Sequence, residues 1–190
     1  MIHFDINYGQ LGRVAEELHA VDERQISKSL WRALRRTEAT LRRLSSSGLR
    51  RELELRTASA LRKRLKNIKL AKVGGLSAGE GVGLWYGLNA FPVSSLKGRA
   101  RKTSGGAEFR GKEFPGGLVG RSSVKGRNTI FKRAGKERLP IVEQLVPLED
   151  KARAFIEREI FSQVETVFWN HFRRDLSARV RFGDSWKSYD

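Results

Sequence analysis

One short stretch of the sequence approaches the pattern of a phosphate-binding loop. Residues 106–113, GAEFRGKE, match the pattern G-x-x-x-x-G-K. In such a loop the backbone N–H groups and the lysine hold phosphates, and a Ser or Thr after the lysine holds magnesium. Here Glu113 occupies that position and would repel a phosphate, and the preceding KTSG is not a buried strand. The sequence therefore favours a flexible basic loop over a nucleotide site.

A second glycine-rich stretch, GEGVG at 79–83, is only part of a dinucleotide fingerprint. That fingerprint requires a strand, a tight turn and a helix in this order. The residues that follow, LWYGL, are typical of a strand. A glycine-rich strand or bulge is therefore favoured here.

Side chains for acid–base or metal chemistry are scattered. His3, His19 and His171 lie far apart in the sequence and none has a second ligand at helical spacing, so a metal site is not expected. The middle of the chain has four isolated carboxylates, at Glu80, Glu108, Glu113 and Glu137. None is paired as general acid–base catalysis requires. We expect a protein that is not an enzyme and that has no metal, cofactor or small-molecule substrate.

Positive charge is the dominant feature of the composition. The net charge is +17, from 38 Lys and Arg against 21 Asp and Glu. Residues 32–72 carry 14 basic and 3 acidic side chains, and residues 73–142 carry 13 and 4. Both ends are nearly neutral, so the excess is not a terminal tail. A central excess of this kind indicates contact with a polyanion or with acidic neighbours.

Two kinds of anionic partner are open for these cations. Basic groups interleaved with Phe109, Phe114 and Phe131 can bind phosphates and stack bases, but no helix-turn-helix, RNP or zinc-finger signature is present. A nonspecific DNA-binding protein is therefore one interpretation, and acidic neighbours in an assembly are the other. The cations expected at DNA or an acidic partner are Arg32, Arg35, Arg36, Arg42, Arg43, Arg127, Lys132, Arg133, Lys136 and Arg138.

The cysteine content, the N-terminal residues and the length of the apolar runs all bear on the compartment of the protein. The chain has no cysteine, so neither disulfides nor thiolate metal sites are expected. Asp5 interrupts the N-terminus before an apolar run of useful length, which argues against a signal peptide. No stretch approaches the roughly 18 apolar residues of a membrane span. We expect a protein of a reducing, cytoplasm-like compartment with no membrane partner.

Helical periodicity dominates residues 10–66, the expected helical half. A short amphipathic helix is predicted at 10–20 and a longer one from Asp22 or Glu23. The longer helix has an apolar stripe of Ile26, Leu30, Ala33, Leu34, Thr37, Leu41 and Leu44. Its arginines fall on the opposite side. Ser45–Gly48 weakens the helix, and a third basic helical segment is predicted from about Thr57 to Lys66.

Residues 68–146 have the character of strands separated by turns. Glycine is dense, and the short apolar runs include GVGLWYGL, NTIFKRA and LPIVEQLV. The piece 97–127 is expected to form a long mobile loop or an extended hairpin. Together with the helical half, this predicts an α+β fold in a single domain over residues 1–190, with a central antiparallel sheet.

A long helix is predicted at 148–180, because Pro147, Glu149 and Asp150 suit a helix N-terminus. One apolar stripe consists of Ala152, Phe155, Ile156, Ile160, Gln163 and Val167. A second stripe, roughly opposite, consists of Phe161, Val164, Phe168 and Phe172. A helix that is apolar on two sides needs two partners, and we expect these to be its own sheet and another subunit.

The order of these pieces resembles a known family. Gly87–Val93 reads GLNAFPV, Ile130–Arg133 reads IFKR, Gly135–Ile141 reads GKERLPI, and Val146-Pro147-Leu148 opens the last helix. These blocks resemble the minor tail protein Z family of long-tailed bacteriophages and prophages. The resemblance extends roughly from the first long helix to residue 175 and is most specific in F-K-R-x-G-K-x-R-L-P-I. The family favours Asn-Pro-Ile where this chain has Asn-Ala-Phe-Pro.

The resemblance implies a structural virion protein for tail completion, located at the neck where the tail meets the head. Such a protein is assembled in the host bacterial cytoplasm and forms a ring, often of six subunits, around the DNA channel. Its partners would be further copies of itself, the tail terminator, the head–tail connector and the packaged double-stranded DNA.

Within that interpretation, GRNTIFKRAGKERLPI at 126–141 is predicted to be a β-hairpin. Ile130-Phe131 and Leu139–Ile141 would anchor its strands, and Ala134-Gly135-Lys136 would form the turn, with a positive φ at Gly135. The residues expected at the interface between subunits are Phe161, Phe168, Phe172, Ile130, Phe131 and Leu139.

Overall fold

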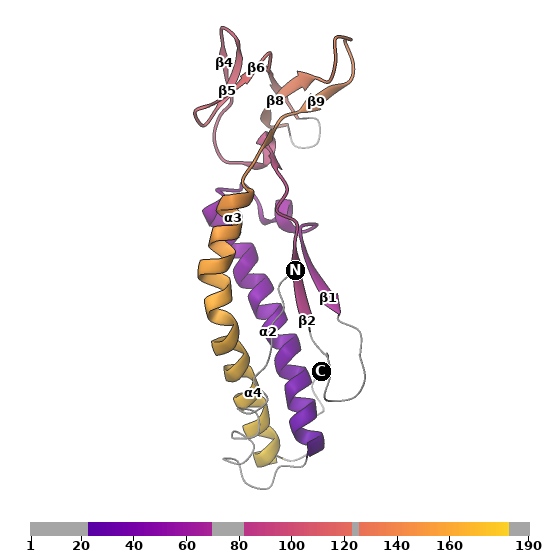
Figure 1. Ribbon diagram of the computed structural model, residues 1–190, viewed down its shortest axis with the longest axis vertical. Helices are drawn as coiled ribbons and strands as arrows, with labels where there is room; N and C mark the ends of the chain where they lie inside the picture. The colour runs from indigo at the N-terminus through magenta and orange to yellow at the C-terminus, as the bar shows by residue number, and fades with distance from the viewer. Residues whose placement is uncertain (1–22, 70–81, 123–125, 183–190) are drawn as a thin grey trace. The chain divides into compact units, whose positions relative to one another are not determined.

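A computed structural model describes residues 23–69, 82–122 and 126–182, and it confirms the α+β class (Figure 1). The chain divides into two compact units, unit 1 and unit 2. Of the described residues, unit 1 holds 23–45, 65–69, 82–86 and 157–182, and unit 2 holds 46–64, 87–122 and 126–156. A single domain over 1–190 stays a prediction. The helix expected at 10–20 and most of GEGVG lie outside the described residues.

The first described element is the predicted long helix, α2, which runs from Glu23 to Glu52. Its apolar stripe is largely confirmed, because Ala33, Leu34 and Leu41 are buried. The helix does not weaken at the serine run but continues for four residues past Gly48. A Cβ atom at Gly48 would lie 2.2 Å from the Phe155 ring, so glycine permits a close approach here rather than a break.

The prediction of a third helix at 57–66 is wrong. A single 3-10 turn, η1 (Ala58–Leu61), is followed directly by strand β1 (Leu65–Lys69). Strand β1 pairs antiparallel with β2 (Val82–Tyr86), from Leu65 opposite Tyr86 to Lys69 opposite Val82. Arg, Lys and Leu have high helix propensity, but propensity contributes only tenths of a kcal/mol per residue, and the tertiary pairing with β2 overrides it.

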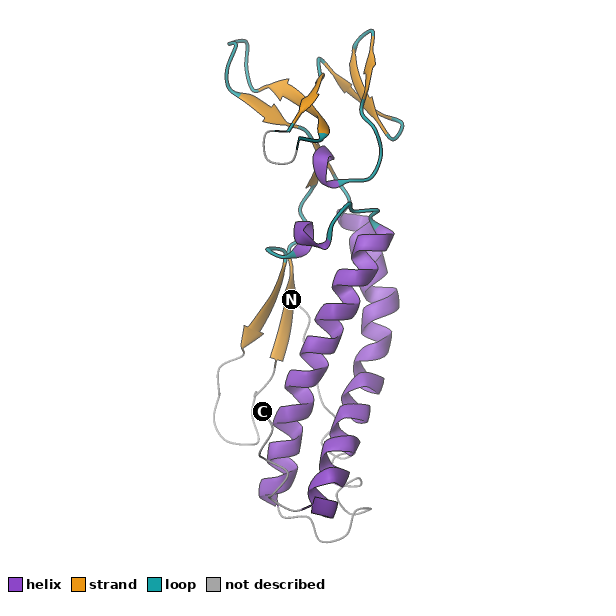
Figure 2. Ribbon diagram, turned by 180° about the vertical axis from the view of Figure 1, so that it is seen from behind, coloured by secondary structure: helices purple, strands orange, loops and turns teal. Residues whose placement is uncertain are grey.

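Unit 1 is built on a pair of helices that lie side by side (Figures 1 and 2). Helix α4 (Ser162–Phe182) packs against the N-terminal half of α2 through a shared apolar core. That core consists of Ala33, Leu34, Phe168, Phe172 and Leu176, with Ile26, Leu30, Trp31 and Trp169 packed around it. The rings of Phe168 and Phe172 stack 5.9 Å apart, and the Trp169 ring meets both edge-on.

Unit 2 contains three small antiparallel sheets instead of one central sheet (Figure 2). The first has the order β4 (Arg101–Thr103), β5 (Gly106–Phe109) and β6 (Lys112–Pro115). The second has the order β7 (Leu118–Arg121), β8 (Asn128–Arg133) and β9 (Ile141–Glu143). The third pairs β3 (Phe91–Pro92) with β10 (Leu145–Val146), and the 3-10 turn η2 (Val93–Ser95) follows β3.

Of the two alternatives predicted for 97–127, the hairpin fits the described residues 97–122 and 126–127, and the long loop does not. Strands β4 to β7 lie within this piece, and Ala107, Phe109 and Phe114 are buried. These three side chains share one face of the first sheet, as the alternation of a strand requires. The register of strands in a sheet with one buried face is set by the apolar residues on that face, even where many glycines surround the strands.

The predicted C-terminal helix is confirmed as a continuous helical run from Glu149 to Phe182. It consists of α3 (Glu149–Phe155), a π-helical segment (Ile156–Phe161) and α4. Among the described residues, no helix is both long and apolar enough to cross a membrane.

Candidate interaction surfaces

The block GRNTIFKRAGKERLPI forms the predicted hairpin. Strand β8 pairs with β9 from Phe131 opposite Glu143 to Arg133 opposite Ile141. The connection is wider than expected and runs over residues 134–140, with Ala134 N–H donating to Pro140 O (3.0 Å) and a cis peptide at Leu139-Pro140. The positive φ predicted for Gly135 is wrong, because a wide connection does not require it.

The base of the hairpin is fixed inside unit 2. Thr129 Oγ1 donates to Glu143 Oε1 (2.5 Å), and the backbone N–H of Ser94 donates to the same oxygen (3.0 Å). Ile130 is fully buried, and its side chain would lie 2.9 Å from a Cβ atom at Gly117. The prediction that places Ile130 at an interface between subunits is therefore wrong, since this residue belongs to the core.

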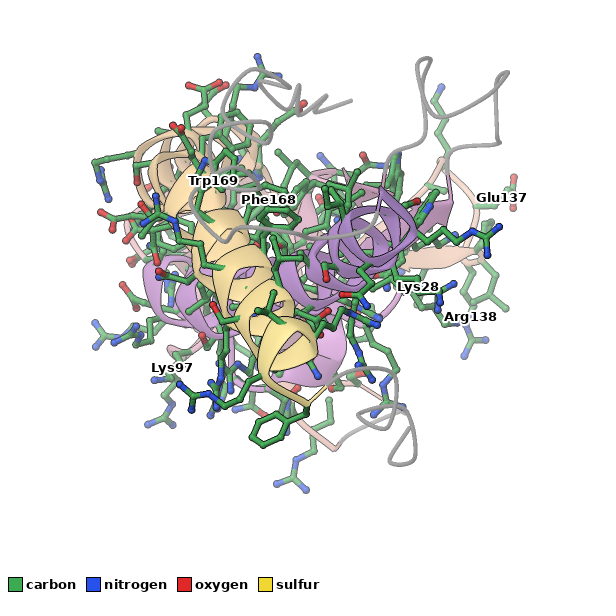
Figure 3. All side chains as sticks on the ribbon, turned by 90° about the horizontal axis from the view of Figure 1, so that it is seen from below. Lys28, Lys97, Glu137, Arg138, Phe168 and Trp169 are labelled. Carbon is green, nitrogen blue, oxygen red and sulfur yellow. The ribbon has the colours of Figure 1, made fainter. Side chains whose placement is uncertain are left out.

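The far end of the hairpin is exposed and mixes apolar and basic side chains. Leu139 is 68% exposed, and Ile141 and Val142 are also exposed. Leu118 of the adjoining strand β7 is exposed as well. We call the following exposed residues of the hairpin and β7 the hairpin patch: Leu118, Leu139, Ile141, Val142, Lys132, Arg133, Lys136 and Arg138. In Figure 3 the side chains of Glu137 and Arg138 project away from the ribbon. Phe131 is half-buried and lies against Gly120.

Two of the predicted DNA or acidic-partner contacts face a carboxylate of the same chain. Asp175 of α4 is buried, and its Oδ1 lies 3.5 Å from Arg32 Nη1 and 4.0 Å from Arg36 Nη1. Its Oδ2 accepts a hydrogen bond from Nε of the buried Arg179 (2.7 Å). Arg32 and Arg36 thus help to join α2 to α4, because the carboxylate needs compensating charge when it is buried.

The remaining predicted cations differ in exposure. Arg35, Arg42 and Arg43 are exposed on α2, as the sequence predicts. Arg127 is half-buried, and its Nη1 is buried without a hydrogen-bond partner. The exposed members can meet an anion, whereas Arg127 is largely covered by its own unit.

The phenylalanine stripe predicted for a neighbouring subunit is mostly core. Phe168 and Phe172 are fully buried against α2, and in Figure 3 Phe168 lies between the two helices. Phe161 alone is exposed, at 38%. Phe168 and Phe172 therefore cannot form an apolar surface patch, and the expected second partner of this stripe is α2 of the same chain.

Three arginines that the sequence did not single out hold backbone carbonyls of unit 2. Arg64 donates to the carbonyls of Gly87, Asn89 and Ala90 and stacks 4.1 Å over the Phe91 ring. Partial burial lowers the pKa of its guanidinium. Through these hydrogen bonds and the stacking on Phe91, the Arg64 side chain fixes the conformation of the GLNAFPV segment. No sequence signal distinguishes Arg64 from the exposed Arg62 and Lys63 beside it.

The two other arginines, Arg56 and Arg110, act in the same way on the carbonyls of residues 96–98. Arg56 donates to the carbonyls of Leu96 (2.6 Å) and Gly98 (2.5 Å). Arg110 donates to the carbonyl of Lys97 (2.8 Å) and to Glu54 Oε2 (2.8 Å). Part of the central basic excess is thus structural and serves neither DNA nor a partner.

His171 does not add to the positive surface of α4. Its Nε2 lies 3.1 Å from Thr40 Oγ1 of α2. Burial lowers the pKa of His171, and the nearby Arg36 and Arg174 lower it further. The lowered pKa favours the neutral ring, which serves as a polar contact between α2 and α4.

The stretch GAEFRGKE is a β-hairpin with a two-residue turn. Strands β5 and β6 pair from Gly106 opposite Pro115 to Phe109 opposite Lys112. Arg110 and Gly111 form the turn with φ values of 55° and 75°, as tight hairpins require. A phosphate-binding loop instead opens a helix. Across the described parts of the chain, no group of three His, Cys, Asp or Glu residues could hold a metal ion.

Comparisons with known proteins return no match: no family profile, no curated protein and no solved structure matches the chain.

Proposed function

We propose that the chain is a structural virion protein of a long-tailed bacteriophage that completes the head-proximal end of the tail and helps to join tail to head. The observation that carries this proposal is the hairpin at 126–141. It contains the most specific block of the resemblance to the minor tail protein Z family, and it presents Leu139 and Ile141 to solvent beside four cations. Large apolar side chains that stay exposed close together in the chain are typical of an interface.

The proposed role sets the partners. The chain assembles with copies of itself into a ring, of six subunits by the resemblance, and contacts the tail terminator, the head–tail connector and the packaged double-stranded DNA. It is located in the tail and neck of the virion and is assembled in the host bacterial cytoplasm. It acts through binding alone, as an assembly component and not as an enzyme.

Disruption of the gene in a phage or prophage that encodes the chain tests this proposal. We expect filled heads and separate tails to accumulate, because the joint between them is incomplete. Wild-type protein supplied in trans should restore joined particles, and Leu139→Asp should not. Electron microscopy and plaque counts measure the outcome, with Trp85→Asp as an exposed apolar control outside the hairpin. Joined, infectious particles that lack the chain would contradict the proposal.

The second candidate function is a nonspecific DNA-binding protein that acts alone. The observation that favours it is the net charge of +17 together with the exposed cations of the hairpin patch. These cations can neutralise phosphates of any sequence, since counterion release drives such binding.

Salt dependence tests the DNA contact directly. If Lys132, Arg133, Lys136 and Arg138 each neutralise one phosphate, together they contribute a slope of about −3.6 in log K against log salt. Affinity then falls about 150-fold between 50 and 200 mM salt from these contacts. Replacing all four by serine should remove this part of the slope. The matched control replaces four exposed cations elsewhere in unit 2, at Arg50, Arg51, Arg62 and Lys63. An unchanged slope in the hairpin variant would exclude this patch from the DNA contact.

A further inference from the structure

Strand β9 lies at the end of its sheet, and one of its two edges has no partner strand. Among the described strands the order is β7-β8-β9, so β9 pairs only with β8 (Figure 1). The backbone hydrogen bonds on either side of this pairing are Ala134 N–H to Pro140 O and Gln144 N–H to Ile130 O. Hydrogen-bonded pairs recur at every second residue of an antiparallel ladder, which makes Val142 with Lys132 the hydrogen-bonded pair between them.

The backbone groups of Ile141 and Glu143 therefore point away from β8. No described backbone or side-chain group bonds to the N–H or C=O groups of these two residues. Each residue contributes one donor and one acceptor to the free edge, at the spacing of alternate residues in a strand. An edge with unpaired N–H and C=O groups is a template for a further strand.

Apolar and basic side chains lie together on each face of this edge. Ile141 and Val142 point to opposite faces, as successive residues of a strand do, and they are 44% and 45% exposed. Arg133 lies opposite Ile141, and Lys132 lies opposite Val142. Each face thus combines one exposed apolar side chain with one exposed cation. A strand added at this edge would meet apolar atoms and positive charge on both of its faces.

The positive charge of the hairpin is not neutralised within the described part of the chain. Four exposed cations form no ion pair there: Lys132, Arg133, Lys136 and Arg138. Residues 132–143 contain two carboxylates, Glu137 in the connection and Glu143 in β9. Glu143 accepts hydrogen bonds from Ser94 N–H and Thr129 Oγ1, so its carboxylate is already bound inside unit 2. The excess of cations favours an anionic partner.

Three kinds of partner are open for this edge, and two of them fit it poorly. A second copy that pairs through the same edge brings the same cations, and charged side chains at an edge are a device that prevents such pairing. DNA phosphates only accept hydrogen bonds, so they would leave the carbonyl groups of Ile141 and Glu143 unpaired. An extended protein segment supplies donors and acceptors in alternation, and its acidic side chains are attracted by the cations.

We propose that the β8–β9 hairpin binds an acidic segment of a different protein, which adds to β9 as an extended strand. The N–H and C=O groups of this segment pair with those of Ile141 and Glu143. Its apolar side chains cover Ile141 and Val142, and its carboxylates face the cations of the hairpin. The inference rests on the proposed function, in which the hairpin is an assembly surface, and it names the chemistry of the partner.

Hydrogen exchange, measured residue by residue by NMR, tests the contact on the wild-type chain. The probe is a synthetic peptide in which Glu and Val alternate, and the matched control is the same peptide with every backbone amide N-methylated. Without peptide, we expect the N–H groups of Ile141 and Glu143 to exchange fast and that of Val142 to exchange slowly. Saturating peptide should slow exchange at Ile141 and Glu143 by about tenfold or more and leave Val142 nearly unchanged.

The charge of the partner is tested by a second comparison. A peptide in which Lys and Val alternate should bind about tenfold or more weakly than the peptide of Glu and Val. Reversing three cations of the hairpin, by Arg133→Glu, Lys136→Glu and Arg138→Glu together, should reverse this preference. The matched control applies the same change to three exposed cations elsewhere in unit 2: Arg50, Arg62 and Lys63. We expect this control to keep the preference of the wild-type chain.

Equal protection by the N-methylated peptide, an unchanged preference in the hairpin variant, or no protection at the highest soluble peptide concentration would overturn the strand addition. Each of these results would leave the proposed function standing. Protection of Ile141 and Glu143 by duplex DNA, or by a higher concentration of the chain alone, would also overturn the proposal, because the edge would then take DNA or a second copy. Strand addition in a chain that purified virions lack would support the contact and overturn the proposed function.

Discussion

Replacing Phe168 by alanine is expected to lower the free energy of unfolding of unit 1 by about 3–5 kcal/mol. Phe168 is fully buried, stacks on Phe172 and meets the edge of Trp169. The substitution leaves a cavity at the centre of the packing between α2 and α4, where rigid helices can collapse only partly. For a chain of this length, the loss corresponds to a melting temperature lower by about 6–20 °C.

Tryptophan fluorescence during thermal unfolding measures this effect, because Trp31 and Trp169 pack against the same core. Phe161→Ala is the matched control on the same helical run. Phe161 is 38% exposed, and we expect its replacement to cost about 1 kcal/mol or less. Similar losses at both positions would mean that Phe168 does not occupy the core described here. The difference in unfolding free energy between Phe168→Ala and Phe161→Ala also decides whether the phenylalanine stripe holds the subunit together or faces a neighbour.

Periodicity assigns the phenylalanine stripe to the wrong partner because a helical wheel assumes a constant 100° per residue. At that angle Phe168 lies 120° from Ile156, on the far side of the helix. The π-helical segment at Ile156–Phe161 accommodates an extra residue, and removing one residue from the count places Phe168 within about 20° of Ile156. Both residues are then expected on the buried side, and both are buried. No residue pattern in the sequence marks this distortion in advance.

By contrast, α2 contains no such distortion, and its apolar stripe could be predicted from periodicity alone. The pairing of its arginines could not be predicted, because Asp175 is more than 130 residues away in the sequence. Periodicity places Arg32 and Arg36 opposite the apolar stripe, but it does not show that a second helix brings a carboxylate to them. The sequence shows which positions are charged, whereas the residue that each charge pairs with depends on the tertiary fold.

The β-rich half was predicted in outline only. Strand character and the hairpin at 126–141 follow from short apolar runs between turn residues. The strands of 97–127 are only three or four residues long, too short for alternation to identify them. Gly106 and Gly111 have positive φ values at or beside the turns that join β4, β5 and β6, and Gly116 has one in the connection from β6 to β7. Glycines that suggest a loop therefore belong to connections between short strands.

Replacing Asp175 by alanine is the second change with a large expected effect. Its carboxylate is fully buried and compensates three guanidinium groups, of which Arg179 is itself buried at 2.7 Å. Removing it leaves the Arg179 charge buried without its partner, which costs about 3–5 kcal/mol. The loss also leaves Arg32 and Arg36 near Arg179 with no carboxylate between them. We therefore expect unit 1 to be destabilised to a similar extent as by Phe168→Ala.

The chain offers an internal control, because Glu149 and Arg153 form an ion pair with the same i, i+4 spacing on the same helical run. That pair spans 3.5 Å with both side chains more than half exposed, so Glu149→Ala should cost about 0.5 kcal/mol or less. Urea unfolding followed by tryptophan fluorescence compares the two variants. A double variant, Asp175→Leu with Arg179→Met, should recover part of the loss, because it removes the buried charge together with its partner. If Asp175→Ala costs no more than Glu149→Ala, Asp175 and its arginines are hydrated like a surface pair and do not hold α2 against α4.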